Sequence, residues 1–283
     1  MIKGIGRLNR RYSTWQAENN KKKFTAKLES LIENLGNRIA EKRVPFHLVS
    51  FSGHRFLADQ VYSILSFYNN VDLPESWTVF DDGTYTDKEI ELLQKIPGLS
   101  VIRHFEMEEY GDLPVAKFPT LKKIILYKSV KITGLTTIFV DSDVLFYPCF
   151  KNFITALQKN NWFLVDENYG YFDKSYLDKM SYDMYPCNLG LFILNTDIEW
   201  NQVIRYIQEK KQTGEIHYWS DQTAFHLLTR GYEKFLPLDP RYFVVSGSDS
   251  FKIGFDYSEK KIAVRHFVGP VRHKMWQVLN MQY

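Results

Sequence analysis

The sequence predicts an α/β protein with a mostly parallel sheet flanked by helices, built as a single elaborated domain. Two observations lead to this prediction. Strand-like apolar runs alternate with helical stretches from residue 46 onward, and hydrophobic residues make up 45% of the chain. Strands that alternate with helices are joined by right-handed crossovers and form a largely parallel sheet. A chain of 283 residues is long enough to bury a sizeable core.

The first 45 residues are expected to form a basic helical arm that precedes the main domain, residues 46–283. Residues 1–43 contain 11 Lys or Arg and four Glu, a net charge of +7, whereas the whole chain carries +3. We expect this arm to be a solvated helix docked on the body. It lacks interleaved aromatics of the type that stack on bases, so we expect no nucleic-acid partner. Its charge would also allow peripheral contact with a membrane. The apolar residues spaced for one helical face are Phe24, Leu28, Leu31, Ile32 and Leu35.

The expected elements follow in alternation. In the first half we expect strands at 46–52, 76–80, 100–105 and 136–140, and helices at 55–68, 86–96 and 118–130. In the second half we expect helices at 150–160, near 198–211 and after Ser220. The strands expected there are 162–167, 189–195 and short ones around 235–238, 242–246 and 262–268.

Three absences indicate a cytoplasmic protein. No run approaches 18 consecutive apolar residues, so the sequence predicts no membrane span. The first residues lack the apolar core of a secretory signal. The two cysteines, Cys149 and Cys187, have no metal-site spacing, and we expect no disulfide framework.

The stretch TTIFVDSDVLFYPCF, residues 136–150, places Asp141 and Asp143 inside an apolar run. Buried carboxylates need a cationic partner. Residues i and i+2 on an extended backbone point the same way, so both acids can converge on one ion at the carboxyl end of their strand. Oxygen ligands suit Mg²⁺ or Mn²⁺, and we expect either ion here. Asp81 and Asp82 end another strand of the same predicted sheet.

Five segments in order resemble the GT-A fold glycosyltransferases, most closely the retaining family 8 type. KFPTLKKIILYKSV followed by FVDSDVLF is similar to the helix and strand that bear the D-x-D motif. WTVFDDGTYTDKEIELL resembles the acidic strand end that holds the nucleoside. CNLGLFILN is similar to the Asn-x-Gly strand beside the donor sugar, SDQTAFHLL to an acidic-glutamine helix start, and HFVGPVRHKMW to the late His-x-x-Gly-x-x-Lys-Pro-Trp motif. The resemblance covers about residues 46–276.

The resemblance implies a metal-dependent hexosyl transfer from a nucleotide-sugar to a saccharide or lipid-linked acceptor. A UDP-linked sugar is the favoured donor. It implies a metal site of Asp141, Asp143 and His266 and a catalytic pair of Asp221 and Gln222. The substrate-binding residues that it implies are Ser50, Asp81, Asp82, Lys122, Lys123, Asp141, Asn188, Gly190, Gly269, Arg272 and Lys274.

The late motif departs from the family pattern, because Arg272 follows Gly269 and Lys274 comes two residues late with Met275 in the place of Pro. Either basic residue therefore remains a candidate for the donor diphosphate. A retaining course follows from the resemblance. An inverting course would need a general base, for which Asp221 is the best candidate.

Two alternatives remain open from the sequence. An aspartate-nucleophile phosphatase of the haloacid dehalogenase type also has an Asp-x-Asp motif after an apolar strand, and would use Asp141 as nucleophile. The motif here follows three earlier strands, which disfavours that interpretation. The other alternative is a catalytically silent protein that binds nucleotide-sugars.

Overall fold

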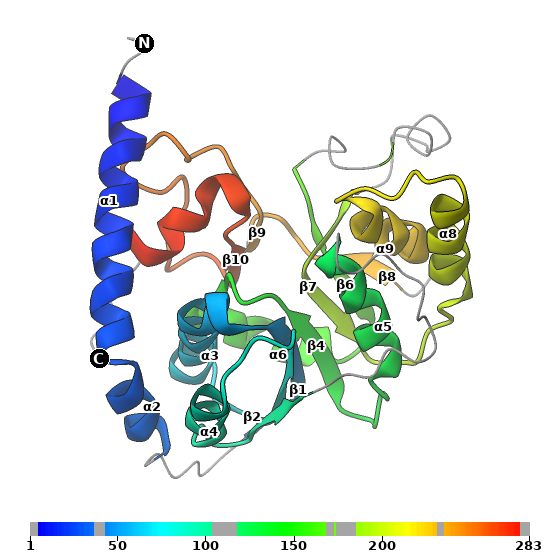
Figure 1. Cartoon of the computed structure of the whole chain (residues 1–283), viewed down its shortest axis with the longest axis horizontal. Helices are drawn as coiled ribbons and strands as arrows, with labels where there is room; N and C mark the ends of the chain where they lie inside the picture. The colour runs from blue at the N-terminus through cyan, green and yellow to red at the C-terminus, as the bar shows by residue number, and fades with distance from the viewer. Residues whose placement is uncertain are drawn as a thin grey trace.

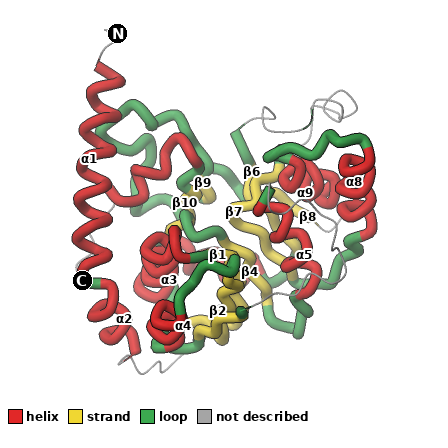
Figure 2. Tube along the Cα trace, in the orientation of Figure 1, coloured by secondary structure: helices red, strands yellow, loops and turns green. Residues whose placement is uncertain are grey.

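A computed structural model describes residues 5–36, 43–103, 118–167, 173, 185–230 and 235–277. Its centre is a seven-stranded sheet in the order β3-β2-β1-β4-β7-β6-β8, with helices on both faces (Figures 1 and 2). The strands are β1 (Arg43–Ser52), β2 (Leu73–Asp81), β3 (Leu99–Ile102), β4 (Thr136–Val140), β6 (Asn161–Val165), β7 (Cys187–Leu194) and β8 (Phe235–Pro237). The predicted α/β fold with a mostly parallel central sheet is confirmed.

A second, three-stranded sheet has the order β5-β10-β9. Its strands are β5 (Val144–Phe146), β9 (Phe243–Val244) and β10 (Val264–His266). The helices are α1 (Ile5–Ala26), α2 (Leu28–Gly36), α3 (Leu57–Asn70), α4 (Asp87–Gln94), α5 (Lys122–Ser129), α6 (Ile154–Leu157), α8 (Asn201–Gln212) and α9 (Ser220–Arg230). Short 3₁₀ helices are η1 (His54–Phe56), η3 (Pro119–Leu121), η4 (Pro148–Phe153) and η5 (Gly269–Gln277).

Strand β7 runs against the other strands of the described central sheet. It pairs antiparallel with β4 on one side and with β6 on the other, whereas β1 pairs parallel with both β2 and β4. The carboxyl ends of β1, β2 and β4 therefore lie at one edge, and the amino end of β7 lies there too. This edge gathers side chains from segments that are far apart in the sequence.

The core has two parts, one on each face of the central sheet, because successive strand residues point to opposite faces. On β4, Ile138 and Val140 belong to the part under α3 and α4, whereas Phe139 belongs to the part under α5, α8 and α9. On β7, Leu191 and Ile193 face the first part, and Phe192 faces the second. The sheet is covered on both faces, as its nearly continuous apolar strands require.

The amino-terminal arm docks on the body as predicted. All five residues of the predicted apolar face, Phe24, Leu28, Leu31, Ile32 and Leu35, are buried. Helix α1 packs against η5 (Figure 1), and Asn20 Nδ2 donates a hydrogen bond of 2.9 Å to the Trp276 carbonyl. The aromatic ring of Trp276 stacks on Tyr62, with centroids 5.0 Å apart.

Several boundaries differ from the prediction. Strand β1 begins at Arg43 rather than at residue 46, and its register with β2 shifts between Val44 and His47. Pro45 lies in that irregularity because it has no N–H for the ladder. The helix expected at 150–160 is divided into η4 and α6. Residues 104–105 of the expected third strand and most of the tyrosine-rich stretch at 168–184 lie outside the described residues.

Among the described residues, no helix combines the length and the apolar character that crossing a lipid bilayer requires.

Candidate active site

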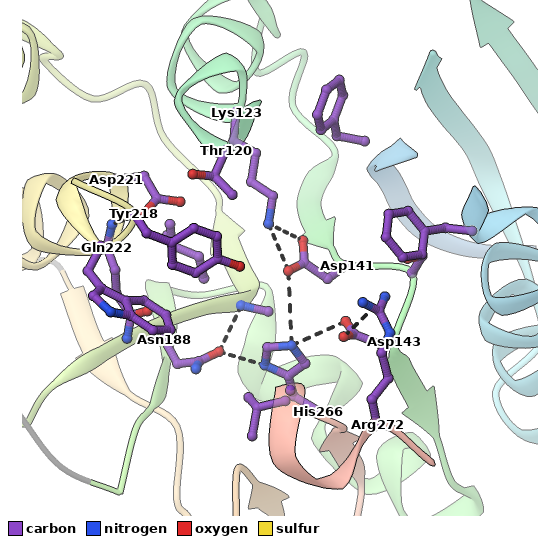
Figure 3. Close-up of a pocket in the computed structure, with 18 of the residues that line it drawn as sticks. Thr120, Lys123, Asp141, Asp143, Asn188, Tyr218, Asp221, Gln222, His266 and Arg272 are labelled. Carbon is purple, nitrogen blue, oxygen red and sulfur yellow. Dashed lines mark hydrogen bonds and ion pairs between the residues drawn. The ribbon is translucent and has the colours of Figure 1, made fainter. Parts of the chain in front are cut away.

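A pocket lies at the carboxyl edge of β1 and β4, between the second sheet and α9 (Figure 3). It brings together most of the side chains that the sequence predicts for the site. The predicted residues that line it are Asp82, Lys123, Asp141, Asp143, Asn188, Gly190, Asp221, Gln222, His266, Gly269 and Arg272.

The two aspartates of the D-x-D motif lie in a turn that links the two sheets. The turn is closed by the Val144 N–H, which donates to the Asp141 carbonyl at 3.2 Å. The extended backbone predicted at Asp141 and Asp143 is wrong, because the chain leaves β4 at Val140 and enters β5 only at Val144. The carboxylates still converge, since the turn directs both into the pocket.

His266 reaches the same point through the pairing of the second sheet. Strand β10 runs antiparallel to β5 with His266 opposite Val144, the residue after the motif. The Nε2 atom of His266 lies 3.2 Å from Asp143 Oδ1 and 4.0 Å from Asp141 Oδ2. One ligand atom from each of the three residues lies within 4.8 Å of the others. The predicted metal-binding trio is therefore assembled in space.

The tautomer of His266 follows from the hydrogen bonds of Asn188. The Asn188 amide has a single consistent orientation, because its Oδ1 accepts from the Gly190 N–H at 2.8 Å and its Nδ2 donates to Asp166 Oδ2 at 2.8 Å. The same Oδ1 lies 2.7 Å from His266 Nδ1. The Nδ1 atom must then carry the proton, and Nε2 is the atom presented to the two carboxylates.

Gly190 leaves the space that the imidazole occupies. A Cβ atom at Gly190 would lie 2.1 Å from His266 Nδ1, a separation that folded proteins do not tolerate. The Asn-x-Gly segment at the start of β7 thus positions His266 (Figure 3). We expected Asn188 and Gly190 to contact substrate, and the contacts that the structure provides are with this histidine.

Lys123 joins the site from the first turn of α5. Its Nζ atom lies 2.6 and 2.7 Å from the two oxygens of Asp141, and the pair is largely buried. Burial disfavours the charged amine, but the Asp141 carboxylate overcomes this and raises the pKa of Lys123 above its usual range. Lys123 is therefore a fixed cation beside the first aspartate of the motif.

Asp143 is held ionised by the groups around it. Arg272 lies 3.4 Å from Asp143 Oδ2, and its guanidinium lies 4.4 Å from the centre of the Phe56 ring. Burial by itself would raise the pKa of Asp143, but His266 and then Arg272 outweigh it and lower the pKa to about 2. A buried carboxylate that stays charged is suited to bind a cation.

Asp221 has the opposite electrostatic environment. It opens α9, and its Oδ1 accepts a hydrogen bond of 2.8 Å from the Gln222 N–H. Burial raises the pKa of Asp221 to about 6, Asp141 adds to the rise, and Lys123 with the Gln222 N–H opposes it. A carboxyl group that titrates near neutral pH is suited to general acid or base chemistry.

Asp166 was missed by the sequence analysis. Its Oδ2 accepts from Asn188 Nδ2 and, at 3.0 Å, from Gln222 Nε2, so it connects the support of His266 with the start of α9. Asp166 directly follows β6 and lines the pocket. The signal that identified Asp141, a carboxylate at the end of an apolar strand, is also present in WFLVDE.

Two aromatic side chains that the sequence left unassigned also line the pocket. Tyr218 and Trp219 precede α9, and their rings lie 4.5 Å apart at 88°. Both are partly exposed, at 55% and 36% respectively. Exposed aromatic rings at the edge of a pocket offer an apolar surface to a ligand.

Four predicted residues do not reach this pocket. Ser50 is a buried residue of β1, and its hydroxyl accepts from Trp77 Nε1 at 2.9 Å. Asp81 accepts from three backbone N–H groups of the loop that follows β2. Lys122 Nζ donates to the Asp82 carbonyl at 3.2 Å. Lys274 is fully buried and donates to the carbonyls of Lys252 and Gly254.

The donor set of the trio fits a divalent cation. Two carboxylates and one imidazole nitrogen are ligands that Mn²⁺ accepts, and Mg²⁺ accepts the oxygens. Asp143 is ionised, and His266 presents Nε2 because Nδ1 is engaged by Asn188. A histidine that ligates a metal is usually held in place by a hydrogen bond at its other ring nitrogen.

No protein-family model and no curated protein matches the sequence. The structure is similar to that of the galactosyltransferase LgtC in complex with donor and acceptor sugar analogues. That match has a TM-score of 0.55 and 14% sequence identity, and it covers 79% of this chain and 87% of that one. Mouse xyloside xylosyltransferase 1, in its apo form, matches with a TM-score of 0.53 and 12% identity over 80% and 98% of the two chains.

The apo form of the glycosyltransferase GlyE of Streptococcus pneumoniae TIGR4 matches with a TM-score of 0.55 and 14% identity, over 83% of this chain and 59% of that one. At these identities, the similarity describes the fold. The chain has the GT-A fold that the five sequence segments indicated.

Proposed function

We propose that this protein is a metal-dependent glycosyltransferase that moves a sugar from a nucleotide-sugar to a saccharide or lipid-linked acceptor. The observation that supports the proposal best is the convergence of Asp141, Asp143 and His266 in a pocket of a GT-A fold. A UDP-linked hexose is the first donor to test. Mn²⁺, or else Mg²⁺, is the proposed metal.

Asp143 and His266 would hold the cation, and Asp141 would share it while remaining paired with Lys123. When bound, a divalent cation at this point supplies Lewis-acid stabilisation of the charge that develops on a leaving diphosphate. Arg272 lies on the same side of the pocket and would donate charge-assisted hydrogen bonds to that diphosphate. Of the two basic candidates in the late motif, Arg272 lines the pocket and Lys274 does not.

Asp221 and Gln222 stand opposite the metal trio, on α9. The Gln222 side chain is held by Asp166, and the carboxyl of Asp221 titrates near neutral pH. In a retaining reaction these two residues would lie against the reacting sugar. In an inverting reaction Asp221 would take the proton of the acceptor hydroxyl.

The remaining parts of the proposal concern the surroundings of the site. Asp82 and the nearby loop would contact the nucleoside, and Gly269 would allow the backbone to approach the donor. A cytoplasmic location fits two cysteines that form no disulfide with each other. The basic amino-terminal arm is proposed to allow peripheral contact with a membrane.

The test is a donor screen. Purified protein is incubated with UDP- and GDP-sugars in Mn²⁺, in Mg²⁺ and in EDTA, and release of the nucleoside diphosphate is measured. The proposal expects slow metal-dependent hydrolysis of one donor, lost in Asp143→Ala. Binding of a donor without any turnover, with or without acceptors, would instead identify a silent nucleotide-sugar-binding protein.

The same preparation tests the phosphatase alternative. That alternative expects phosphate release from simple phosphomonoesters and a covalent phosphate on Asp141. Asp141 follows the fourth of the described strands, whereas the phosphatase motif follows a first strand. Trapping an aspartyl-phosphate at Asp141 would decide against the transferase.

A further inference from the structure

Helix α1 exposes a row of large apolar side chains to solvent. Ile5, Leu8, Tyr12 and Trp15 are exposed by 48%, 64%, 51% and 60%. They are spaced three and four residues apart, so they lie along one face of the helix. The rings of Tyr12 and Trp15 contact each other, with centroids 6.0 Å apart. Single exposed apolar residues are ordinary, but a continuous row marks an interaction surface.

This row is not the face by which α1 docks on the body. The docked face is formed by the buried residues Ser13, Ala17 and Phe24. At 3.6 residues per turn, these lie on nearly the opposite side of the helix from Leu8 and Trp15. The arm therefore has two apolar faces, of which the body covers one.

A loop of the main domain places two more exposed apolar residues beside α1, on another side of the helix from the row. Phe251 and Ile253 are exposed by 48% and 55%. Phe251 lies against α1, since a Cβ at Gly6 would be 3.4 Å from its Cβ and Arg10 stacks on its ring at 5.2 Å. We name these six residues the α1 surface: Ile5, Leu8, Tyr12, Trp15, Phe251 and Ile253.

Arginines line a hollow that separates Phe251 from the row of apolar residues on α1. Arg7, Arg10 and Arg11 line this hollow between Phe251 and Trp15, and Glu18 lies at its end. Among the described residues, no acidic group forms an ion pair with Arg7 or Arg11. In the sequence, residues 1–17 contain four basic residues and no acidic one. The surface thus combines apolar walls with concentrated positive charge.

We infer that the α1 surface binds the interface of an anionic lipid bilayer. Trp and Tyr favour the headgroup region, aliphatic side chains enter the acyl boundary, and arginines pair with anionic headgroups. A second copy of the chain is a poorer occupant, because two such surfaces would bring their arginines together without acidic groups to offset them. The charge therefore selects an anionic partner, and the aliphatic residues select one with an apolar interior.

No residue of the α1 surface lines the candidate active site, so membrane binding is independent of the proposed function. The two are linked by structure, since α1 packs on η5 and η5 carries Arg272. Attachment through α1 would hold the pocket at a set position relative to the lipid surface.

The experiment is flotation of the full chain with vesicles of phosphatidylcholine alone or mixed with phosphatidylglycerol. Wild type is expected to float with the mixed vesicles, more weakly as salt rises, and to stay behind with phosphatidylcholine alone. Leu8→Gln combined with Trp15→Gln should weaken binding at least about tenfold, because it removes two inserted side chains. Arg7→Gln combined with Arg11→Gln should weaken it by about the same factor.

Leu236→Gln is the matched control, because Leu236 is an exposed apolar residue on β8, far along the chain from α1. It should bind as wild type does. All variants should retain wild-type circular dichroism, and a loss of donor turnover alone would bear only on the proposed function. Wild type that does not float with mixed vesicles at low salt would overturn the inference. So would a dimer in light scattering that only the Leu8 and Trp15 changes disrupt, without vesicle binding.

Discussion

Asp143 and Asp221 are buried carboxyl groups of the same pocket, and their surroundings shift their pKa values in opposite directions. Asp143 faces His266 and Arg272, which lower its pKa to about 2 despite burial. Asp221 is desolvated and forms no ion pair within the part of the chain that the structure describes, so its pKa rises to about 6 although Lys123 opposes the rise. Two acids in one site with pKa values pushed apart are suited to different tasks. Asp143 stays charged and can hold a cation, whereas Asp221 can exchange a proton near neutral pH.

The largest expected effect comes from removing the charged member of this pair. Asp143→Ala should reduce donor turnover by about a thousandfold or more, because a transition-state contribution of several kcal/mol would be lost with the metal. Calorimetric titration with Mn²⁺ should show the loss of binding directly. The variant should also unfold at a lower temperature, because the ionised carboxylate stabilises the folded state and faces His266 and Arg272. Turnover is therefore compared at a temperature at which circular dichroism shows the variant to be folded.

Asp256→Asn serves as the control for that change, because Asp256 forms a partly exposed ion pair with Lys252 outside the pocket. It should leave both turnover and Mn²⁺ binding unchanged. Full donor turnover by the Asp143 variant, or by wild type in EDTA, would show that the cluster is not a functional metal site.

Asp221, the member with the raised pKa, should reveal itself in the pH dependence of stability. The pKa of Asp221 is about 6 in the folded state and near 3.8 in the unfolded chain, so the folded state binds this proton more tightly. The free energy of unfolding should therefore fall as pH rises from about 4 to 6, by up to about 3 kcal/mol, and level off above. Asp221→Asn should remove this slope.

The measurement is urea unfolding of wild type and Asp221→Asn at several pH values in EDTA, expressed as the difference between the two proteins. Taking the difference cancels other titrating groups, including Glu259, whose pKa burial also raises. Parallel curves for the two proteins between pH 4 and 6 would contradict the raised pKa, and with it the contrast to Asp143.

A smaller effect is expected from the support of His266. Gly190→Ala would place a methyl group 2.1 Å from His266 Nδ1, and Asn188→Ala would remove the acceptor that fixes its tautomer. Each should weaken Mn²⁺ binding by about 10- to 100-fold, the usual effect of losing such a support. Gly254→Ala is the control, because no atom lies within 4 Å of its added Cβ. Unchanged Mn²⁺ affinity in both variants would assign Asn188 and Gly190 to the sugar instead.

Two routes led from the sequence to this site. Asp141 and Asp143 follow a strand with a clear apolar pattern, so their position at one edge of the sheet could be inferred. His266, Asp221 and Gln222 were assigned from the resemblance of their segments to the family motifs. The rule for strand ends would have identified Asp166. The helices and longer strands were predicted for the same reason, because their apolar periodicity extends over many residues.

The parts that were not predicted depend on contacts between segments far apart in the sequence. The role of Asn188 requires knowing that β10 brings His266 beside β7, and β10 is only three residues long. Short strands have no measurable periodicity, so their pairing partners could not be read. The antiparallel direction of β7 is a further example, because an apolar run is the same in either direction.

Arg272 and Lys274 show how two neighbouring cations acquire different roles, and they provide the last prediction. Arg272 lines the pocket near Asp143, whereas Lys274 is buried on two backbone carbonyls behind it. Arg272→Ala should weaken donor binding by about tenfold, the lower end for a charge-assisted hydrogen bond, because its side chain is partly exposed. Its effect should be smaller on UMP, which lacks the second phosphate. Lys274→Met should instead lower the unfolding temperature, since it leaves two buried carbonyls without a donor, and folded variant protein should bind the donor as wild type does. Calorimetry with UDP-sugar and UMP, beside thermal unfolding, separates the two residues. Loss of donor affinity in well-folded Lys274→Met, with none in Arg272→Ala, would reverse their assignment.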